Sequence, residues 1–298
     1  MTNPSKPKER RMVALQIHHR TTYRYERPVS LGSHRLMLRP RESRDVRLIG
    51  SEVNLTPSGI LHWAYDVFGN AIATATFGAP SDTLVIDSVA RVELSAAAYP
   101  VFDIDASAIS YPFPYSEDAR TDLGALAVQQ YSNDGRLLSW AQGFVASNPT
   151  DTLSLLQDLN AGVANGIAYI AREDEGTQSP DQTLAIGQGS CRDLATLFVE
   201  AARSLGMGAR IVSGYLHDPT RTLVGSADAG STHAWGEVYV PGAGWITFDP
   251  TNRRMGGANL IPVAVARDIR QAMPVVGSFM GLQSDFLGMA VEVRVTQA

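Results

Sequence analysis

Strand-like alternation of apolar and polar residues fills the first third of this 298-residue chain. In residues 84–94 every second side chain is apolar or small and polar residues lie between them, which is the pattern of a strand with one buried face. Residues 61–65 and 71–77 are predicted to form a hairpin, because residues 66–70 between them contain a Gly-Asn pair. Several short strands separated by turn signals predict an antiparallel sandwich or an open barrel.

A stiff segment separates this pattern from a helical one. Pro112 and Pro114 each restrict their own backbone and that of the preceding residue, so a linker is expected near residues 100–118. From there to about residue 206, apolar residues recur at helical spacing, as in residues 137–145 and 153–163. The middle of the chain is therefore predicted to be helical.

Strand-like segments return after the helical region. They cover residues 209–215, 232–240 and 244–249, and residues 241–244 join the last two as a hairpin turn. Alternating valines in residues 291–295 predict one more strand near the end of the chain.

These patterns together predict an α+β protein with two domains. The length suits one large or two medium domains, and such a chain can bury a core without disulfides. We divide it into an N-terminal antiparallel β domain at residues 1–110 and a second domain at residues 111–298, which contains the candidate catalytic residues considered below.

Composition excludes several kinds of partner. The net charge of -5 argues against nucleic acid, and the short basic cluster at residues 6–11 is expected to be a frayed, solvated start. There is no apolar run of about 18 residues, so no membrane contact is expected. The single cysteine cannot form an intramolecular disulfide, and the start lacks a signal-peptide pattern, so a cytoplasmic location is expected. His34, His62 and His217 have no ligand-spaced partners, so no metal is expected, and the chemistry predicted below requires no other cofactor. The oligomeric state is left open.

Cys191 is the candidate nucleophile. It opens a helical pattern, and the free N–H groups and dipole of a helix N-terminus favour a thiolate. Its own backbone N–H can help to hold an oxyanion. The glycines before it let a substrate approach the backbone, so Gly189 is a candidate substrate-binding residue. The alternative interpretation is a buried structural cysteine.

His233 and Asp249 are the candidate base and the group that orients it. In a strand over residues 232–240, His233 shares a face with Trp235, which is a second candidate for substrate binding. A hairpin can bring Asp249 beside His233, where a carboxylate fixes the imidazole tautomer and stabilises the imidazolium. Taken singly, His233 can also be a structural histidine, and Asp249 a turn former before Pro250.

Five segments of the chain resemble a known family, the bacterial transglutaminase-like proteins. Residues 22–41 are similar to the N-terminal β domain of these proteins. The segments that resemble their core are residues 189–195, 203–215, 233–239 and 245–252. The resemblance implies a papain-like α+β core with a Cys-His-Asp triad on Cys191, His233 and Asp249.

The resemblance also implies a side chain upstream of the cysteine that helps to stabilise the oxyanion. Tyr169 and Gln188 are both candidates. Animal transglutaminases use calcium, but no acidic loop with the required spacing is present here. The family includes proteases and amidases, so the resemblance alone does not fix the reaction.

The triad predicts cleavage of a peptide or isopeptide-like amide through a thioester acyl-enzyme. Water would then give hydrolysis and an amine would give transfer. The expected partner is a peptide or protein substrate. The alternative is a catalytically quiet binding or assembly module on the same scaffold, and the intact triad counts against it. A serine or metal hydrolase lacks its own motif in this sequence.

Overall fold

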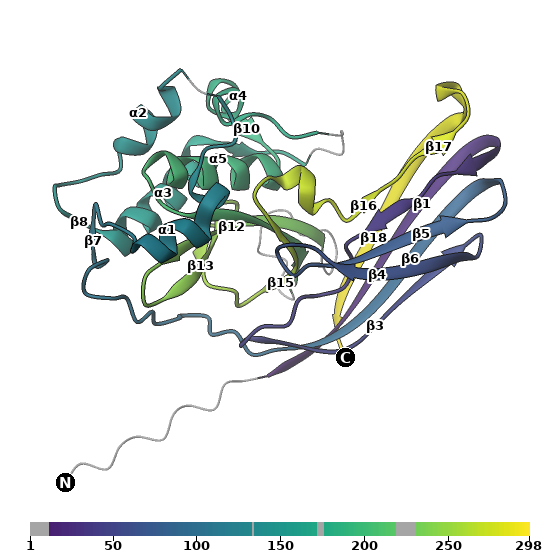
Figure 1. Ribbon diagram of the computed structural model, residues 1–298, viewed down its shortest axis with the longest axis horizontal. Helices are drawn as coiled ribbons and strands as arrows, with labels where there is room; N and C mark the ends of the chain where they lie inside the picture. Colours follow the sequence, from purple (N-terminus) through teal and green to yellow (C-terminus); the bar gives the residue numbers. More distant parts are fainter. Residues whose placement is uncertain (1–11, 133, 172–175, 219–230) are drawn as a thin grey trace, which may run out of the picture.

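The fold combines a layer of long strands with a second layer, in which helices pack on a separate sheet (Figure 1). The computed structural model describes residues 12–132, 134–171, 176–218 and 231–298. The basic cluster at residues 6–11 lies outside the described residues. The expected α+β class, with an N-terminal antiparallel β layer followed by helices packed on an antiparallel sheet, is confirmed.

The N-terminal layer is a sandwich of two antiparallel sheets. One sheet has the order β17-β1-β6-β3, with β18 also paired to β1, and the other has the order β16-β2-β5-β4. Apolar side chains from both sheets meet in one buried cluster that includes Tyr25, Leu36 and Ile86. The first six strands are β1 (Val13–Leu31), β2 (His34–Leu36), β3 (Val46–Thr56), β4 (Gly59–Tyr65), β5 (Ala71–Phe77) and β6 (Ser81–Leu94). The alternation predicted for residues 84–94 is confirmed, because even-numbered positions from 84 to 94 are buried.

The end of the chain returns to this sandwich. β18 (Phe286–Gln297) runs antiparallel along β1, with Ile17 opposite Val295, while β16 (Val275–Val276) pairs with β2 and β17 (Phe279–Met280) with β1. The strand predicted at residues 291–295 therefore exists. Segments within residues 275–297, which we assigned to the second domain, thus pair with strands of the N-terminal sheets. The division into domains at residues 1–110 and 111–298 stays a prediction.

The helical region follows a connection without helix or strand at residues 95–109. Its helices are α1 (Glu117–Leu123), η1 (Gly124–Ala127), α2 (Arg136–Gln142), α3 (Thr152–Gly166), α4 (Pro180–Ile186) and α5 (Cys191–Ser204). Two short strand pairs join them, and these are β7 (Ser110–Tyr111) with β8 (Thr150–Asp151) and β9 (Ala168–Tyr169) with β10 (Gln188–Gly189). The predicted helical middle of the chain is confirmed, although α2 ends earlier than the spacing in residues 137–145 indicated.

The core of the second layer is an antiparallel sheet with the order β14-β13-β12-β11-β15. Its strands are β11 (Ala209–Leu216), β12 (Ser231–Val240), β13 (Gly244–Asp249), β14 (Arg254–Met255) and β15 (Leu260–Ala266). α5 crosses one face so closely that a Cβ at Gly236 would lie 2.7 Å from Phe198. The α5 side chains Leu194, Phe198 and Ala202 are fully buried there. This packing sets the start of α5 against the start of β12.

A third buried cluster joins the two layers. Leu15 and Ile17 of β1 pack with Tyr215 of β11 and Ile261 of β15. The short 3-10 helices η2 (Ile269–Ala272) and η3 (Gln283–Asp285) lie in the return path to the sandwich. None of the described helices is both long and apolar enough to span a membrane.

Candidate active site

Cys191 is the first residue of α5, as predicted. The turn before it is fixed by the buried carboxylate of Asp193, which accepts hydrogen bonds from the Ser190 backbone N–H and hydroxyl, both at 2.8 Å. The backbone N–H of Gln178 donates to the same carboxylate at 2.7 Å. Cys191 itself is only partly buried. The helix start therefore holds the thiol in a fixed position at the free N–H groups of the first turn.

Gly189 has a packing role in the structure. It is buried, and a Cβ at this position would lie 2.8 Å from the Asp193 Cβ. Its carbonyl accepts the Ile170 N–H at 2.9 Å in the β9–β10 pair. Only glycine fits this close approach between strand and helix. Gly189 thus shapes the turn beneath the nucleophile, and its predicted contact with substrate stays a prediction.

His233 and Asp249 meet across the hairpin, as the strand faces predicted. Phe248 pairs with Gly236, so Asp249 projects on the same face as His233. The His233 Nε2 and Asp249 Oδ2 atoms are 3.0 Å apart, and both side chains are almost fully buried. The Asn252 side chain donates to Asp249 Oδ2 at 2.8 Å, and its backbone N–H donates to Oδ1 at 3.2 Å. The carboxylate is therefore held from both sides.

The second ring nitrogen of His233 is left for the thiol. His233 Nδ1 is buried and has no hydrogen-bond partner among the described residues. Burial alone would raise the pKa of Cys191, but the interaction with His233 and the Ala234 backbone N–H lower that pKa below its ordinary value. Burial alone would lower the pKa of His233, but the charge of Asp249 and its hydrogen bond raise it to about 10. The site therefore favours a thiolate–imidazolium pair.

Trp235 does not face a substrate site, which corrects one prediction. Its side chain is 1% exposed and packs with Val212, Leu216, Leu260 and Val265. The sequence showed that Trp235 shares a face with His233, but it could not show that a second layer covers that face. The ring of Trp235 lies 6.1 Å from that of His233, centroid to centroid, at an interplanar angle of 29°. Its contacts are those of a support for the histidine.

Tyr169 lies closer to the nucleophile than the sequence could show. Strand β9 pairs with β10 in parallel, and this register puts Tyr169 beside Gly189. Burial and the charge of Cys191 both raise the pKa of the Tyr169 phenol, so its hydroxyl stays a hydrogen-bond donor. Gln188, the other candidate, is exposed. The parallel pairing of β9 with β10 is a tertiary contact, and residue spacing in the sequence does not predict it.

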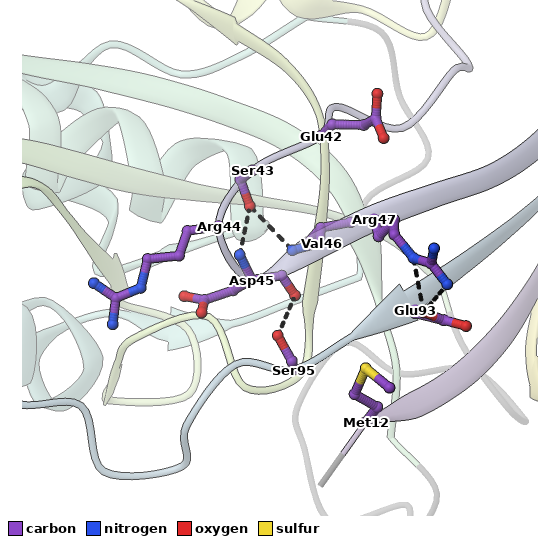
Figure 2. Close-up of a pocket in the computed structure, with 9 residues that line it drawn as sticks. All are labelled: Met12, Glu42, Ser43, Arg44, Asp45, Val46, Arg47, Glu93 and Ser95. Atoms are coloured by element: carbon purple, nitrogen blue, oxygen red, sulfur yellow. Dashed lines mark hydrogen bonds and ion pairs between the residues drawn. The ribbon is translucent and has the colours of Figure 1, made fainter. Parts of the chain in front are cut away.

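One hollow lies beside this site, and another lies away from it on the N-terminal sandwich. A cavity of about 750 Å³ reaches Asp249, Leu216 and Asn160, and the chain around Tyr99 and Arg254 forms its rim. A second one of about 300 Å³ lies at the edge of the N-terminal sandwich, beside the Arg47–Glu93 ion pair (Figure 2). In that hollow the Ser43 hydroxyl accepts the N–H groups of Asp45 and Val46. It shares no residue with the triad.

The described part of the chain contains no group of three or more His, Cys, Asp or Glu side chains placed to hold a metal ion. The arrangement at α5, β12 and β13 is instead a nucleophile, a base and a carboxylate in sequence, which is the arrangement of a cysteine enzyme.

Comparison with known proteins gives the family. Residues 15–93 match the bacterial transglutaminase-like N-terminal region, and residues 139–250 match the transglutaminase-like superfamily. The second match contains Cys191, His233 and Asp249. Residues 139–250 therefore belong to the transglutaminase-like superfamily, a family of cysteine-dependent enzymes, and residues 15–93 form the N-terminal region that accompanies this core in bacteria.

Similar proteins cover nearly the whole chain. The uncharacterized protein ML0607 of Mycobacterium leprae is 25% identical over 95% of this chain and 99% of its own length. The uncharacterized protein Rv2569c of Mycobacterium tuberculosis is 25% identical over 93% of this chain and 91% of its own. The crystal structure of a candidate cysteine protease from Cytophaga hutchinsonii is 20% identical, with a TM-score of 0.73 over 97% of this chain and 92% of that one. This last likeness shows that the two-layer fold is shared.

Proposed function

We propose that this protein cleaves amide bonds of peptide or protein substrates through a thioester on Cys191. The observation that carries the proposal is the buried His233–Asp249 pair, whose imidazole lowers the pKa of the partly buried thiol at the start of α5. Membership of the transglutaminase-like superfamily supports the same class of chemistry. Neither a metal nor an organic cofactor has a role in the steps below.

The first half of the reaction forms the acyl-enzyme. The Cys191 thiolate attacks the carbonyl carbon of the amide, and the carbonyl oxygen becomes an oxyanion. The Cys191 backbone N–H and the Tyr169 hydroxyl are the donors that we assign to this oxyanion. His233 gives its proton to the leaving amine, the C–N bond breaks, and the acyl group stays on sulfur as a thioester.

The second half releases the acyl group. His233, now neutral, takes a proton from the attacking water or amine, and the thiolate leaves as the new C–O or C–N bond forms. Water gives a carboxylic acid, and an amine gives a transferred amide. We favour hydrolysis of peptide or isopeptide-like bonds, because water is always present and supports this outcome without an amine pocket.

Trapping of the acyl-enzyme tests this proposal. The protein is mixed with a peptide library and quenched with acid, and the tryptic peptide that contains Cys191 is analysed by mass spectrometry. We expect acyl adducts on Cys191 whose mass identifies the donor, and no adduct on Cys191 in the His233→Ala variant. Adding a primary amine to the reaction separates transfer from hydrolysis by the mass of the product.

If no adduct is found, the ionisation of Cys191 must be measured independently. Iodoacetamide alkylates thiolates, so its rate from pH 5 to pH 9 follows the ionisation of Cys191. If no adduct forms and the wild type alkylates like an ordinary thiol, with no effect of His233→Ala, the enzyme proposal is wrong. The catalytically quiet binding module would then be the better interpretation.

A further inference from the structure

The hairpin between β4 and β5 ends in a rigid turn at residues 66–70, which we call the β4–β5 tip. The Asp66 carboxylate accepts the backbone N–H groups of Phe68 and Asn70, each at 2.9 Å, and the Asn70 side-chain amide at 2.8 Å. Gly69 has φ 71°, a left-handed conformation that glycine adopts without strain. The turn therefore holds its side chains in fixed directions.

Asn70 fastens the β4–β5 tip to the catalytic sheet. Its side chain is fully buried and pairs with the backbone of Val265 in β15, donating to the carbonyl at 2.7 Å and accepting the N–H at 2.9 Å. Arg41 donates to Asn70 Oδ1 at 2.6 Å and to the Phe68 carbonyl at 3.1 Å. Buried hydrogen bonds of this kind are costly to lose, so the contact is a firm attachment between the layers.

Phe68 is the apolar part of the same attachment. It packs against the buried cluster of Val212, Leu216, Trp235 and Val265 on the face of the catalytic sheet opposite α5. Through Phe68, a residue of the N-terminal sandwich packs against the cluster that contains Trp235, two residues from His233. Residues 66–70 join strands of the sandwich, yet their packing partners belong to the catalytic sheet.

The contact matters because a catalytic ring must be held closely. Functional side chains need to stay within about 0.5 Å of their productive geometry, and neighbouring packing provides this restraint. His233 has Asp249 on one ring nitrogen, and the ring of Trp235 lies nearly parallel to its own. If the Trp235 ring can move, one of the restraints on the imidazole is lost.

We infer that Phe68 is a positioning residue, through which the N-terminal sandwich holds Trp235 and thereby the imidazole of His233. The inference rests on the proposed function, since it assumes that His233 activates Cys191. It assigns the N-terminal region an indirect part, through Trp235, in keeping the nucleophile ionised. Phe68 itself touches neither the thiol nor the imidazole.

Graded truncation of Phe68 tests the inference in the full-length chain. The variants Phe68→Leu, Phe68→Val and Phe68→Ala remove increasing volume beneath Trp235. We expect the midpoint of the iodoacetamide rate–pH curve to move upward along this series. For Phe68→Ala the shift should be about one pH unit, which slows alkylation about tenfold at pH values below both midpoints. Phe68→Leu should keep a curve close to wild type, and if the alanine variant does not fold, the valine variant carries the test.

Two controls separate positioning from loss of stability. Phe77→Ala removes a phenylalanine that packs inside the sandwich, away from the Trp235 cluster. It should lower the melting temperature without moving the rate–pH curve. Val67→Ala changes a neighbour of Phe68 that is 95% exposed, and it should alter neither property.

The outcomes distinguish this inference from the proposed function. An activated thiol in the wild type, with an unchanged curve in every folded Phe68 variant, overturns the positioning role and leaves the triad intact. A shift in Phe77→Ala as large as that in Phe68→Ala also overturns it, because general loosening would then explain both. An ordinary thiol in the wild type overturns the proposed function and the positioning role together.

Discussion

At the scale of single residues, the ionisation of Cys191 depends on a carboxylate that it does not touch. Asp249 lies behind His233, and its charge and hydrogen bond keep the ring protonated well above the usual range of histidine. The pKa of Asp249 is itself lowered, because the charge of His233 and the hydrogen bonds from Asn252 outweigh the burial that would raise it. Each member of the triad therefore needs its neighbour charged.

Asp249→Asn should lower the fraction of Cys191 that is ionised. Without the carboxylate the pKa of His233 falls, the imidazolium is lost near neutral pH, and the pKa of Cys191 rises toward the ordinary thiol value. The midpoint of the iodoacetamide rate–pH curve should move upward by at least one unit, which slows alkylation at least tenfold at pH values below both midpoints. Glu93→Gln removes a carboxylate on the far sandwich and should leave the curve in place. An unmoved curve in Asp249→Asn would argue against the triad.

Tyr169→Phe tests the oxyanion assignment. Loss of a single oxyanion donor typically slows the chemical step by about 100- to 1,000-fold. We expect slower acylation by the donor found in the trapping experiment, measured in a single turnover, and an unchanged rate with iodoacetamide. Alkylation forms no oxyanion, so it reports only the thiolate. Gln188→Ala is the matched comparison, and a larger loss there than in Tyr169→Phe would reverse the assignment.

At the scale of elements, α5 is anchored at both ends by buried charge. Asp193 fixes the start, and the end is held by Arg203 and Glu200, whose side chains form a 2.6 Å ion pair at 0% and 1% exposure. Arg203 also donates to the carbonyls of Ala209 and Arg267 at 2.7 and 2.9 Å. The helix that carries the nucleophile is thus tied to the strands beneath it.

Glu200→Ala should destabilise the fold strongly, because it leaves the Arg203 charge buried without its partner. Removal of one member of a buried pair costs about 3–5 kcal/mol. The free energy of unfolding in urea measures this loss. Glu93→Ala breaks the surface pair with Arg47, whose side chain is 67% exposed, and should cost less than about 1 kcal/mol. Equal losses in the two variants would contradict the buried role.

Much of the site was predictable because its determinants are local. The helix start at Cys191 follows from glycines before an apolar periodic run, and the alignment of His233 with Asp249 follows from two strand faces joined by a short turn. The role of Trp235 was not predictable. Trp235 is buried in a cluster against which Phe68 packs, more than 160 residues earlier in the chain, and alternation within one strand says nothing about what covers the strand.

At the scale of the whole molecule, the last strand of the chain pairs with the first. Figure 1 shows the last strand beside the first, and β18 pairs with β1 over most of its length. Alternating valines predicted a strand there, but a strand pattern does not name its partner. Both ends of the sequence thus build the sandwich that faces the catalytic sheet.

The expected cytoplasmic location stays a prediction.

A buried histidine lies where the two layers meet. His19 of β1 is 2% exposed, and its Nδ1 atom is 3.0 Å from the Tyr215 hydroxyl of β11 while its Nε2 atom is 3.1 Å from the Thr21 hydroxyl. Burial, and to a lesser degree the neighbouring His18, lower the pKa of His19 to about 4. The folded protein therefore keeps this ring neutral over a range in which the unfolded chain binds a proton.

Acid should accordingly weaken the fold through His19. Between pH 6.5 and about 4 the unfolded state holds the proton and the folded state does not, so the free energy of unfolding falls as the pH falls. The full effect is about 3 kcal/mol, and it develops across this window. Urea unfolding at pH 7 and pH 4.5 should show a smaller loss in His19→Gln than in wild type, because glutamine keeps a hydrogen-bonding side chain but does not titrate. His62→Gln, at an exposed position of β4, should lose as much as wild type. If His19→Gln shows the full acid loss, the sensitivity arises elsewhere and His19 does not govern the contact between the layers.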